Sequence, residues 1–373
     1  MLSKGIHEQE LTCRRALAHA TTSESGRLCR PSLLAGTPKG LAKPIPMLVC
    51  FISNTCIART LPAARVKART TAMPSQGSTQ KGLQTMSANG REKVHDPYFV
   101  CIGSQKAGTD WIYDQFGSHK DFWRHPIKEV HYFDRGFGRA RIAKAQRKLA
   151  WMTRHHAQGK GDFTHEISFL IRMSERTPPP SFPGDGVKPY RALFQNRPGL
   201  CFDCTPSYLS INLRIASEMY VQLPETYFII AVREPVSRLW SQALMHDRLN
   251  PGDPVTTSLH DFKEFAHRPA VKSLSFLSRQ IQGWLELDES DSRVGVFFFD
   301  DLKSDPKRYR DAMCNYLNVA PSSFTLDAGF NKKRSQSGKR AMPIEYENWA
   351  LEYFTDERKV LADTLGGPAL SWL

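Results

Sequence analysis

Apolar runs of strand length recur in the chain after residue 96. Stretches rich in aromatic and β-branched residues occupy Tyr98 to Ile102, Tyr227 to Val232 and Arg293 to Phe299. Continuous apolar runs of this length are typical of strands that are buried on both faces, as in a parallel sheet. Segments with helical periodicity lie between or before them, such as Arg135 to His156 and Ser278 to Leu287. A length of 373 residues suits one large α/β domain or two smaller ones.

The segment before residue 96 has no such periodicity. From Met1 to His95 there are 14 Lys/Arg against 4 Asp/Glu, so +10 of the formal net charge of +14 lies there. A basic, acid-poor composition that is rich in Ser, Thr and Ala resembles a plastid or mitochondrial transit sequence. We therefore expect residues 1–95 to be a disordered or targeting segment and residues 96–373 to form the domain.

One apolar stretch inside that segment raises the alternative of a membrane anchor. Ile45 to Ala58 is mostly apolar and is flanked by basic residues. It contains 14 residues, fewer than the roughly 20 that a membrane-spanning helix needs. A signal anchor that directs the chain to the Golgi is therefore the weaker interpretation, and a cytoplasmic location is the third alternative.

The charge of the rest of the chain limits its partners. Residues after His95 carry only +4 of the net charge, which argues against a nucleic-acid-binding domain. This modest basic excess suits a pocket for an anionic nucleotide.

The eight cysteines form neither a disulfide framework nor a metal motif. Cys201 and Cys204 have the spacing of a zinc knuckle, but no second Cys/His pair with matching spacing follows them. The carboxylates of Asp300, Asp301 and Asp305 follow no metal-loop spacing. We therefore predict no metal site.

The loop after the first apolar run has the chemistry of an anion site. It reads Gly103-Ser-Gln-Lys106-Ala-Gly108-Thr109 and leads into a helical segment that ends near Phe116. Exposed backbone N–H groups and the positive end of a helix attract phosphate, and a lysine adds a full charge. The order differs from the P-loop of nucleotide kinases, in which Gly-Lys-Ser/Thr closes the motif.

This loop resembles the 5′-phosphosulfate loop of sulfotransferases that use 3′-phosphoadenosine 5′-phosphosulfate (PAPS). The resemblance implies a single α/β domain with a central parallel sheet flanked by helices, in a P-loop-kinase-like sulfotransferase fold. It also implies donor contacts from Ser104, Gln105, Lys106, Ala107, Gly108, Thr109, Asp110 and Trp111. Asp110 departs from the family, which usually has Thr or Ser there. An anion at this place would weaken donor binding by about 1 kcal/mol.

A second segment carries candidate bases. In Lys-Glu129-Val-His131-Tyr-Phe-Asp134, the glutamate and histidine are two residues apart and would share one face of an extended segment. Either side chain suits general-base catalysis. The segment resembles Lys-Glu-x-His-Phe-Phe-Asp of heparan-sulfate-type sulfotransferases, in which the glutamate is the proposed base. The resemblance implies that Glu129 takes the acceptor proton, with His131 as the substitute, and that Lys106 stabilises the leaving group.

A third segment suits a terminal phosphate. Arg233-Glu-Pro-Val-Ser-Arg238-Leu-Trp-Ser241 follows the apolar run that ends at Val232. An arginine fork with a hydroxyl is suitable for phosphate recognition. The segment resembles the family's 3′-phosphate signature, Arg-x-Pro-x-x-Arg-x-x-Ser, which implies that Arg233 and Ser241 bind this phosphate. Arg238 fits either a ligand contact or a structural charge.

Two further segments resemble the family less closely. Asp203-Cys204-Thr-Pro-Ser-Tyr208 matches an element in which heparan-sulfate enzymes carry a catalytic lysine at the position of Cys204. The absence of this lysine from the chain puts specificity for glycosaminoglycan acceptors in doubt. The basic loop at Gly338-Lys339-Arg340 resembles the family's Lys-Gly-Arg loop over the nucleotide with lysine and glycine exchanged, which implies donor contacts from Lys339 and Arg340.

Together these resemblances imply an enzyme that transfers a sulfuryl group from PAPS to the hydroxyl or amine of an unidentified acceptor and releases PAP. Two other classes remain open. A kinase would need a magnesium carboxylate and the P-loop order of residues, neither of which the sequence contains. A non-catalytic nucleotide-binding module is favoured by Asp110.

Overall fold

The computed structural model describes residues 96–134, 139–175, 186–290, 292–324 and 340–373, all of which belong to the unit Ala64–Leu373. Residues 1–95 lie outside this set, so their interpretation as a disordered or targeting segment stays a prediction. Within the described ranges, no helix is both long enough and apolar enough to cross a membrane.

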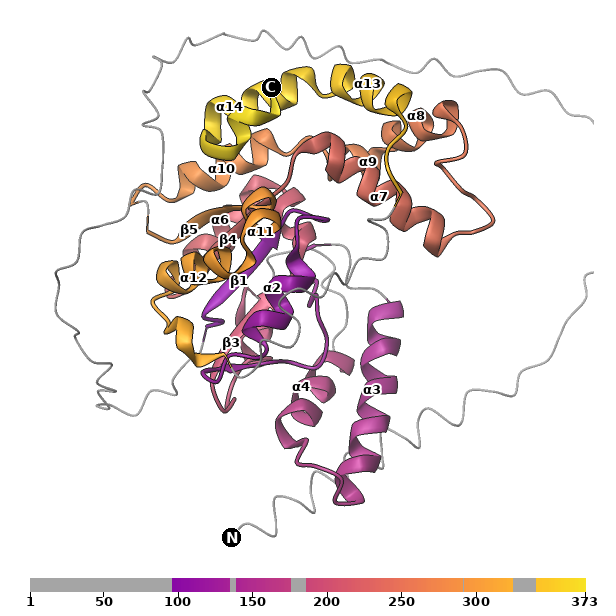
Figure 1. The fold of residues 1–373 in the computed structure, drawn as a ribbon. Coiled ribbons are helices and arrows are strands. Elements are labelled where there is room, and N and C mark those ends of the chain that lie inside the picture. Colours follow the sequence, from indigo (N-terminus) through magenta and orange to yellow (C-terminus); the bar gives the residue numbers. More distant parts are fainter. Residues whose placement is uncertain (1–95, 135–138, 176–185, 291, 325–339) are drawn as a thin grey trace, which may run out of the picture. The chain divides into compact units, whose positions relative to one another are not determined.

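A parallel sheet lies at the centre of the described domain (Figure 1). Its strand order is β2-β3-β1-β4-β5, and all four pairings of neighbours are parallel. The strands are β1 (Phe99–Gly103), β2 (Phe122–Trp123), β3 (Leu200–Cys204), β4 (Tyr227–Val232) and β5 (Val294–Phe298). The predicted α/β architecture with a central parallel sheet flanked by helices is confirmed.

Helices cover both faces of this sheet. The longer ones are α2 (Thr109–Phe116), α3 (Arg139–Ala157), α4 (Thr164–Ser174), α6 (Leu213–Gln222), α7 (Pro235–Leu249), α8 (Leu259–His267), α10 (Ser278–Leu287), α12 (Pro306–Tyr316), α13 (Ile344–Tyr353) and α14 (Thr355–Leu365). Shorter ones are α5 (Lys188–Ala192), α9 (Pro269–Lys272) and α11 (Phe299–Ser304), with 3₁₀ turns η1 (Pro206–Ser210), η2 (Pro321–Ser323) and η4 (Gly367–Trp372). The helices expected near Arg135–His156 and at Ser278–Leu287 correspond to α3 and α10.

Strand β1 shows why its apolar run is continuous. Phe99 and Cys101 belong to a core cluster with residues of α2 and α12, whereas Val100 and Ile102 belong to a second cluster with residues of α6, α10 and α14. All five residues of β1 are buried, because helices cover the sheet on both sides of this strand.

The expected burial of the strand near Arg293 to Phe299 is wrong. Four of the five residues of β5, all those after Val294, are half-buried. Among the described strands β5 pairs only with β4, so it forms an edge of the sheet. One side of an edge strand has no neighbouring strand, which leaves its side chains more accessible.

The loops that contain the candidate residues follow the carboxyl ends of four parallel strands. Ser104 to Gly108 follow β1, Arg124 to Asp134 follow β2, Thr205 and η1 follow β3, and Arg233 follows β4. Carboxyl ends of parallel strands lie at one edge of a sheet, which is where open α/β sheets bind ligands. The sheet therefore brings the three separate sequence motifs to the same edge.

Candidate active site

Two glycines allow the loop after β1 to fold tightly against its surroundings. Gly103 and Gly108 have φ values of +147° and +88°. A Cβ atom at Gly103 would lie 2.5 Å from the carbonyl oxygen of Pro206, and one at Gly108 would lie 2.6 Å from Cδ2 of Leu302. Gly103 therefore requires glycine for backbone conformation and for space, and Gly108 requires it for backbone conformation.

Helix α2 begins directly after this loop and supplies backbone donors. The N–H of Ile112 donates to the carbonyl of Gly108 over 3.1 Å, which closes the first turn. The first N–H groups of an α-helix point beyond its N-terminal end, and here that end follows the glycine loop. Together with the positive end of the helix dipole, they make this position suitable for an anion.

Arg233 connects the end of β4 to the glycine loop. Its Nη1 donates to the carbonyl of Lys106 over 3.0 Å, and its Nε donates to Oγ of Ser237 over 3.2 Å. The guanidinium also lies over the ring of Phe299, 4.6 Å from its centroid. The structure thus brings together two residues that the sequence predicts to contact the donor, Lys106 and Arg233.

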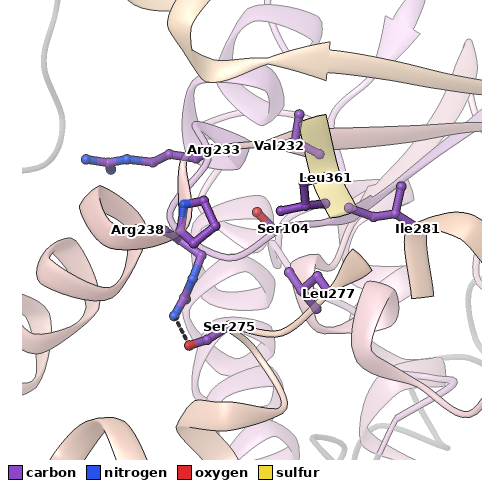
Figure 2. Close-up of a pocket in the computed structure, with 9 residues that line it drawn as sticks. Ser104, Val232, Arg233, Arg238, Ser275, Leu277, Ile281 and Leu361 are labelled. Carbon is purple, nitrogen blue, oxygen red and sulfur yellow. Dashed lines mark hydrogen bonds between the residues drawn. The ribbon is translucent and has the colours of Figure 1, made fainter. Parts of the chain in front are cut away.

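Arg238 has a different environment. It is fully buried, and its Nη2 donates to Gln242 over 2.8 Å and to Ser275 over 2.5 Å. Figure 2 shows that its side chain runs toward Ser275, away from the side chain of Arg233. The cavity that both arginines line has a volume of about 10 Å³, about the space of one water molecule. These contacts favour the structural interpretation of Arg238.

Burial disfavours the charged forms of the cations in this region. Burial lowers the pKa of Lys106, and the nearby guanidinium groups of Arg233 and Arg248 lower it further while Asp110 opposes them. Burial also lowers the pKa of Arg233, and lowers that of Arg238 to about 9. A phosphate or sulfate bound here would favour the charged forms of Lys106 and Arg233.

The loop after β2 places Glu129 and His131 together, but not on an extended segment. Their φ values are +65° and +55°, in the left-handed region, so the expected extended geometry is wrong. The intervening Val130 is fully buried and holds the turn against the core. The two side chains still meet, with Nε2 of His131 3.2 Å from Oε2 of Glu129.

His131 lies between two carboxylates. Its Nδ1 is 2.8 Å from Oδ2 of Asp134, which also accepts a hydrogen bond from Ser207 of η1. Because carboxylates only accept hydrogen bonds, a ring that is protonated on both nitrogens satisfies both neighbours. Burial raises the pKa of Glu129, but hydrogen bonds and charge from His131 and Lys128 outweigh it and hold this pKa well below its usual range.

Lys128 is a functional candidate that the sequence analysis did not single out. Its Nζ lies 3.1 Å from Oδ1 of Asp110 in α2 and 3.0 Å from Oε1 of Glu129. Burial alone would lower the pKa of Lys128, but these two carboxylates raise it above its ordinary value. The sequence feature that could have indicated this role is the position of Lys128 directly before Glu129 in the motif.

The other residues that are predicted to contact the donor differ in burial. Ser104, Ala107 and Thr109 are buried in or beside the loop, Gln105 is half-buried, and Trp111 packs edge-on against Tyr309 with ring centroids 5.7 Å apart. Ser241 is half-buried on α7, two turns after Arg233.

Arg340 contacts α7 and the segment that follows it. It donates to Oγ1 of Thr256 over 2.9 Å, and its carbonyl accepts a hydrogen bond of 3.0 Å from Nε1 of Trp240. These contacts hold Arg340 beside the residue that precedes Ser241. Lys339 lies outside the described residues, so its predicted role stays a prediction.

Comparisons with known proteins gave matches only among solved structures. No protein-family model and no curated protein matches the chain. A sulfotransferase from Alicyclobacillus acidocaldarius aligns with 18% identity and a TM-score of 0.47, over 74% of this chain and 98% of that one. The sulfotransferase domain from the curacin biosynthetic pathway aligns with 13% identity and a TM-score of 0.40, over 74% and 94%.

A third match is the sulfotransferase domain of the olefin synthase from Synechococcus PCC 7002. It has 14% identity and a TM-score of 0.37, over 72% of this chain and 98% of that one. Identities and TM-scores of this size do not assign a function to the chain. Its chemistry has to be derived from the residues of the site.

These residues provide the groups that transfer of an anionic group requires. The glycine loop and Lys106 suit an anion at one point, and Arg233 adds a second cation joined to the same loop. Glu129 provides a proton acceptor, His131 can accept a proton only when its ring is neutral, and Lys128 connects this pair to α2. In the described ranges, no group of His, Cys, Asp and Glu side chains is arranged to hold a metal ion.

Proposed function

We propose that the chain is a PAPS-dependent sulfotransferase. It transfers the sulfuryl group of PAPS to a hydroxyl or amine of an acceptor and releases PAP. The observation that supports this most directly is the link through Lys128, which joins the helix after the glycine loop to Glu129. A donor on the loop and an acceptor beside Glu129 would therefore be neighbours.

The donor would bind along the carboxyl edge of the sheet. Lys106 and the first N–H groups of α2 suit the 5′-phosphosulfate, and they would stabilise the charge that develops on the leaving phosphate. Arg233 at the end of β4, with Ser241 on the following helix α7, suits the 3′-phosphate, which distinguishes PAPS from ordinary adenine nucleotides. The hydrogen bond from Arg233 to the carbonyl of Lys106 would keep the two phosphate subsites in a fixed relation.

The acceptor proton would pass to the pair Glu129 and His131. The acceptor oxygen or nitrogen forms a bond to sulfur as the bond from sulfur to the phosphate oxygen breaks, and PAP leaves with that electron pair. The proton lost by the acceptor goes to Glu129, with His131 as the substitute base. Asp134 orients His131 through Nδ1.

A non-catalytic PAPS-binding module is the second candidate, and one observation favours it. The pKa of Glu129 is held well below its usual range by its hydrogen bonds and ion pairs. A carboxylate with such a low pKa is a weak base, whereas general bases work best with a pKa near the working pH. Under the enzymatic proposal, acceptor binding must release Glu129 from Lys128 or His131.

Incubation with PAPS labelled in its sulfur, with a panel of alcohols, amines and saccharides, tests the proposal. We expect the label to move to at least one acceptor, and a Lys106→Met variant to lose this transfer. Binding of PAP without turnover by any acceptor would identify a binding module. Absence of PAP binding would contradict both candidates.

A further inference from the structure

The turn that contains His131 is held by two buried side chains from a different segment. The N–H of Val130 donates to Oδ1 of Asp203 over 3.4 Å, and the N–H of Tyr132 donates to the hydroxyl of Tyr208 over 2.6 Å. These two N–H groups stand on either side of His131 in the chain. Both acceptors belong to the end of β3 and to η1.

Such external support is needed because the turn is unfavourable by itself. Glu129 and His131 both have positive φ values, which residues other than glycine seldom adopt. Residues in such regions remain there only where the surrounding structure holds them. The hydrogen bonds to Val130 and Tyr132 therefore help to determine where both candidate bases point.

The two acceptors are themselves firmly held. Asp203 and Tyr208 are fully buried. Asp203 also accepts hydrogen bonds from Oγ1 of Thr205 over 2.8 Å and from the hydroxyl of Tyr190 over 3.1 Å. Burial raises the pKa of Asp203, and that of Tyr208 well above the usual value for a tyrosine. Tyr208 thus keeps its hydroxyl proton and presents an oxygen to Tyr132.

The segment that holds this turn also contacts the glycine loop. The N–H of Thr205 donates to the carbonyl of Cys101 over 3.0 Å. Gly103 lies so close to η1 that an added Cβ would be 2.5 Å from the carbonyl oxygen of Pro206 and 2.7 Å from Cβ of Leu209. One short segment, the end of β3 together with η1, therefore contacts both β1 and the turn with the candidate bases. The glycine loop starts from β1.

We propose that Tyr208, supported by Asp203, is a positioning residue that sets the Glu129–His131 turn relative to the glycine loop. Its kinetic consequence rests on the proposed sulfotransferase function, whereas its structural consequence does not. A displacement of about 1 Å in reacting groups costs about a hundredfold in rate, so loss of this support should lower turnover without loss of donor binding.

The test compares two tyrosines that each lose one buried hydroxyl. Tyr208→Phe removes the acceptor for the N–H of Tyr132, whereas Tyr190→Phe removes a donor to the far oxygen of Asp203 and leaves the turn's own bonds in place. Hydrogen–deuterium exchange of peptides that cover residues 127–134 should become about tenfold faster in Tyr208→Phe. It should stay within about twofold of the parent protein in Tyr190→Phe.

Kinetics provides the second measurement. In Tyr208→Phe, kcat for sulfuryl transfer should fall by about tenfold to a hundredfold, while KM for PAPS stays unchanged. Tyr190→Phe should change both parameters much less than Tyr208→Phe, because Tyr190 acts on the turn only through Asp203. Equal exchange rates in the two variants, or unchanged exchange in Tyr208→Phe, would overturn the proposal. If the parent protein transfers no sulfuryl group, the proposed function fails, and the exchange measurement still decides the positioning role.

A second pair of variants covers the case in which Tyr208→Phe does not fold. Asp203→Asn keeps an oxygen that accepts from Val130, whereas Asp203→Leu has none. Slow exchange of residues 127–134 should be kept in the asparagine variant and lost in the leucine variant. Fast exchange in both, or slow exchange in both, contradicts the role of Asp203 as a support.

Discussion

Nζ of Lys128 lies 3.1 Å from Oδ1 of Asp110, so the carboxylate that departs from the sulfotransferase pattern has a cationic partner. The side chain of Asp110 is 68% exposed, and that of Lys128 is 16% exposed. An anion beside a phosphate site is less unfavourable when a half-buried ammonium group compensates its charge. The pair thus weakens the main sequence-based argument for a non-catalytic protein.

Replacement of Asp110 tests how much of its charge the donor still experiences. In Asp110→Thr, Lys128 loses a carboxylate partner, and the first turn of α2 loses a negative charge. We expect PAP to bind about twofold to tenfold more tightly, since an exposed charge contributes about 1 kcal/mol or less. Calorimetric titration measures this change. Weaker binding would mean that Asp110 holds Lys128 in place for the donor.

Arg233 and Ser241 should recognise the 3′-phosphate alone. We expect Ser241→Ala and Arg233→Gln to weaken binding of PAP by about tenfold or more, the usual size for loss of a charge-assisted contact. Binding of AMP, which has no 3′-phosphate, should change little in Ser241→Ala. Lys106→Gln should weaken binding of both nucleotides and is the matched comparison. Equal losses of affinity for PAP and AMP in Ser241→Ala would show that Ser241 does not bind the 3′-phosphate.

Measurements of turnover and of PAP affinity together show which residue is the base. Glutamine keeps the shape of Glu129 but accepts no proton, so Glu129→Gln should lower turnover by about a hundredfold or more. PAP affinity should barely change, because the donor contacts come from other residues. If His131→Ala abolishes turnover while Glu129→Gln leaves it near normal, histidine is the base. Loss of PAP binding in both variants would show that the turn is structural.

His125 should make the free energy of unfolding depend on pH, whatever the function of the candidate active site. Burial lowers the pKa of His125 to about 3, whereas a histidine in the unfolded chain titrates near about 6.5. Between these values the unfolded chain binds the extra proton. The free energy of unfolding therefore falls as the pH decreases below about 6.5, by about 1.4 kcal/mol per pH unit.

The comparison with His125→Leu isolates this contribution. Denaturant unfolding at pH 7 and pH 5 should show a loss in the parent protein that exceeds the loss in His125→Leu by about 2 kcal/mol. His260→Leu, at an exposed position of α8, controls for the removal of a histidine. Parallel pH profiles for the parent protein and His125→Leu would show that His125 titrates alike in both states.

The sequence was sufficient to place strands β1, β4 and β5 and to give the order of the motifs, but it did not indicate β2 or β3. The apolar runs at β1 and β4 are continuous because helices cover both faces, so the pattern alone indicates a buried parallel sheet. The glycine loop could also be predicted, because Gly103 and Gly108 have positive φ values that favour glycine. Local rules of this kind depend little on the rest of the fold.

The geometry around the candidate bases was not readable. The expectation of an extended segment failed because Val130 and Tyr132 are held by Asp203 and Tyr208, which lie far away in the sequence. The ion pair between Asp110 and Lys128 likewise depends on how two loops approach each other. Periodicity contains no information on such contacts between distant segments.

The central claim is that the site binds PAPS as its donor. Calorimetric titration of the parent protein with PAP, AMP and magnesium-ATP tests this claim most directly. The proposed donor site predicts that PAP binds at least about tenfold more tightly than AMP, a difference of about 1.4 kcal/mol. It also predicts that PAP binding needs no added metal. Tight, magnesium-dependent binding of ATP together with no measurable binding of PAP would contradict the account.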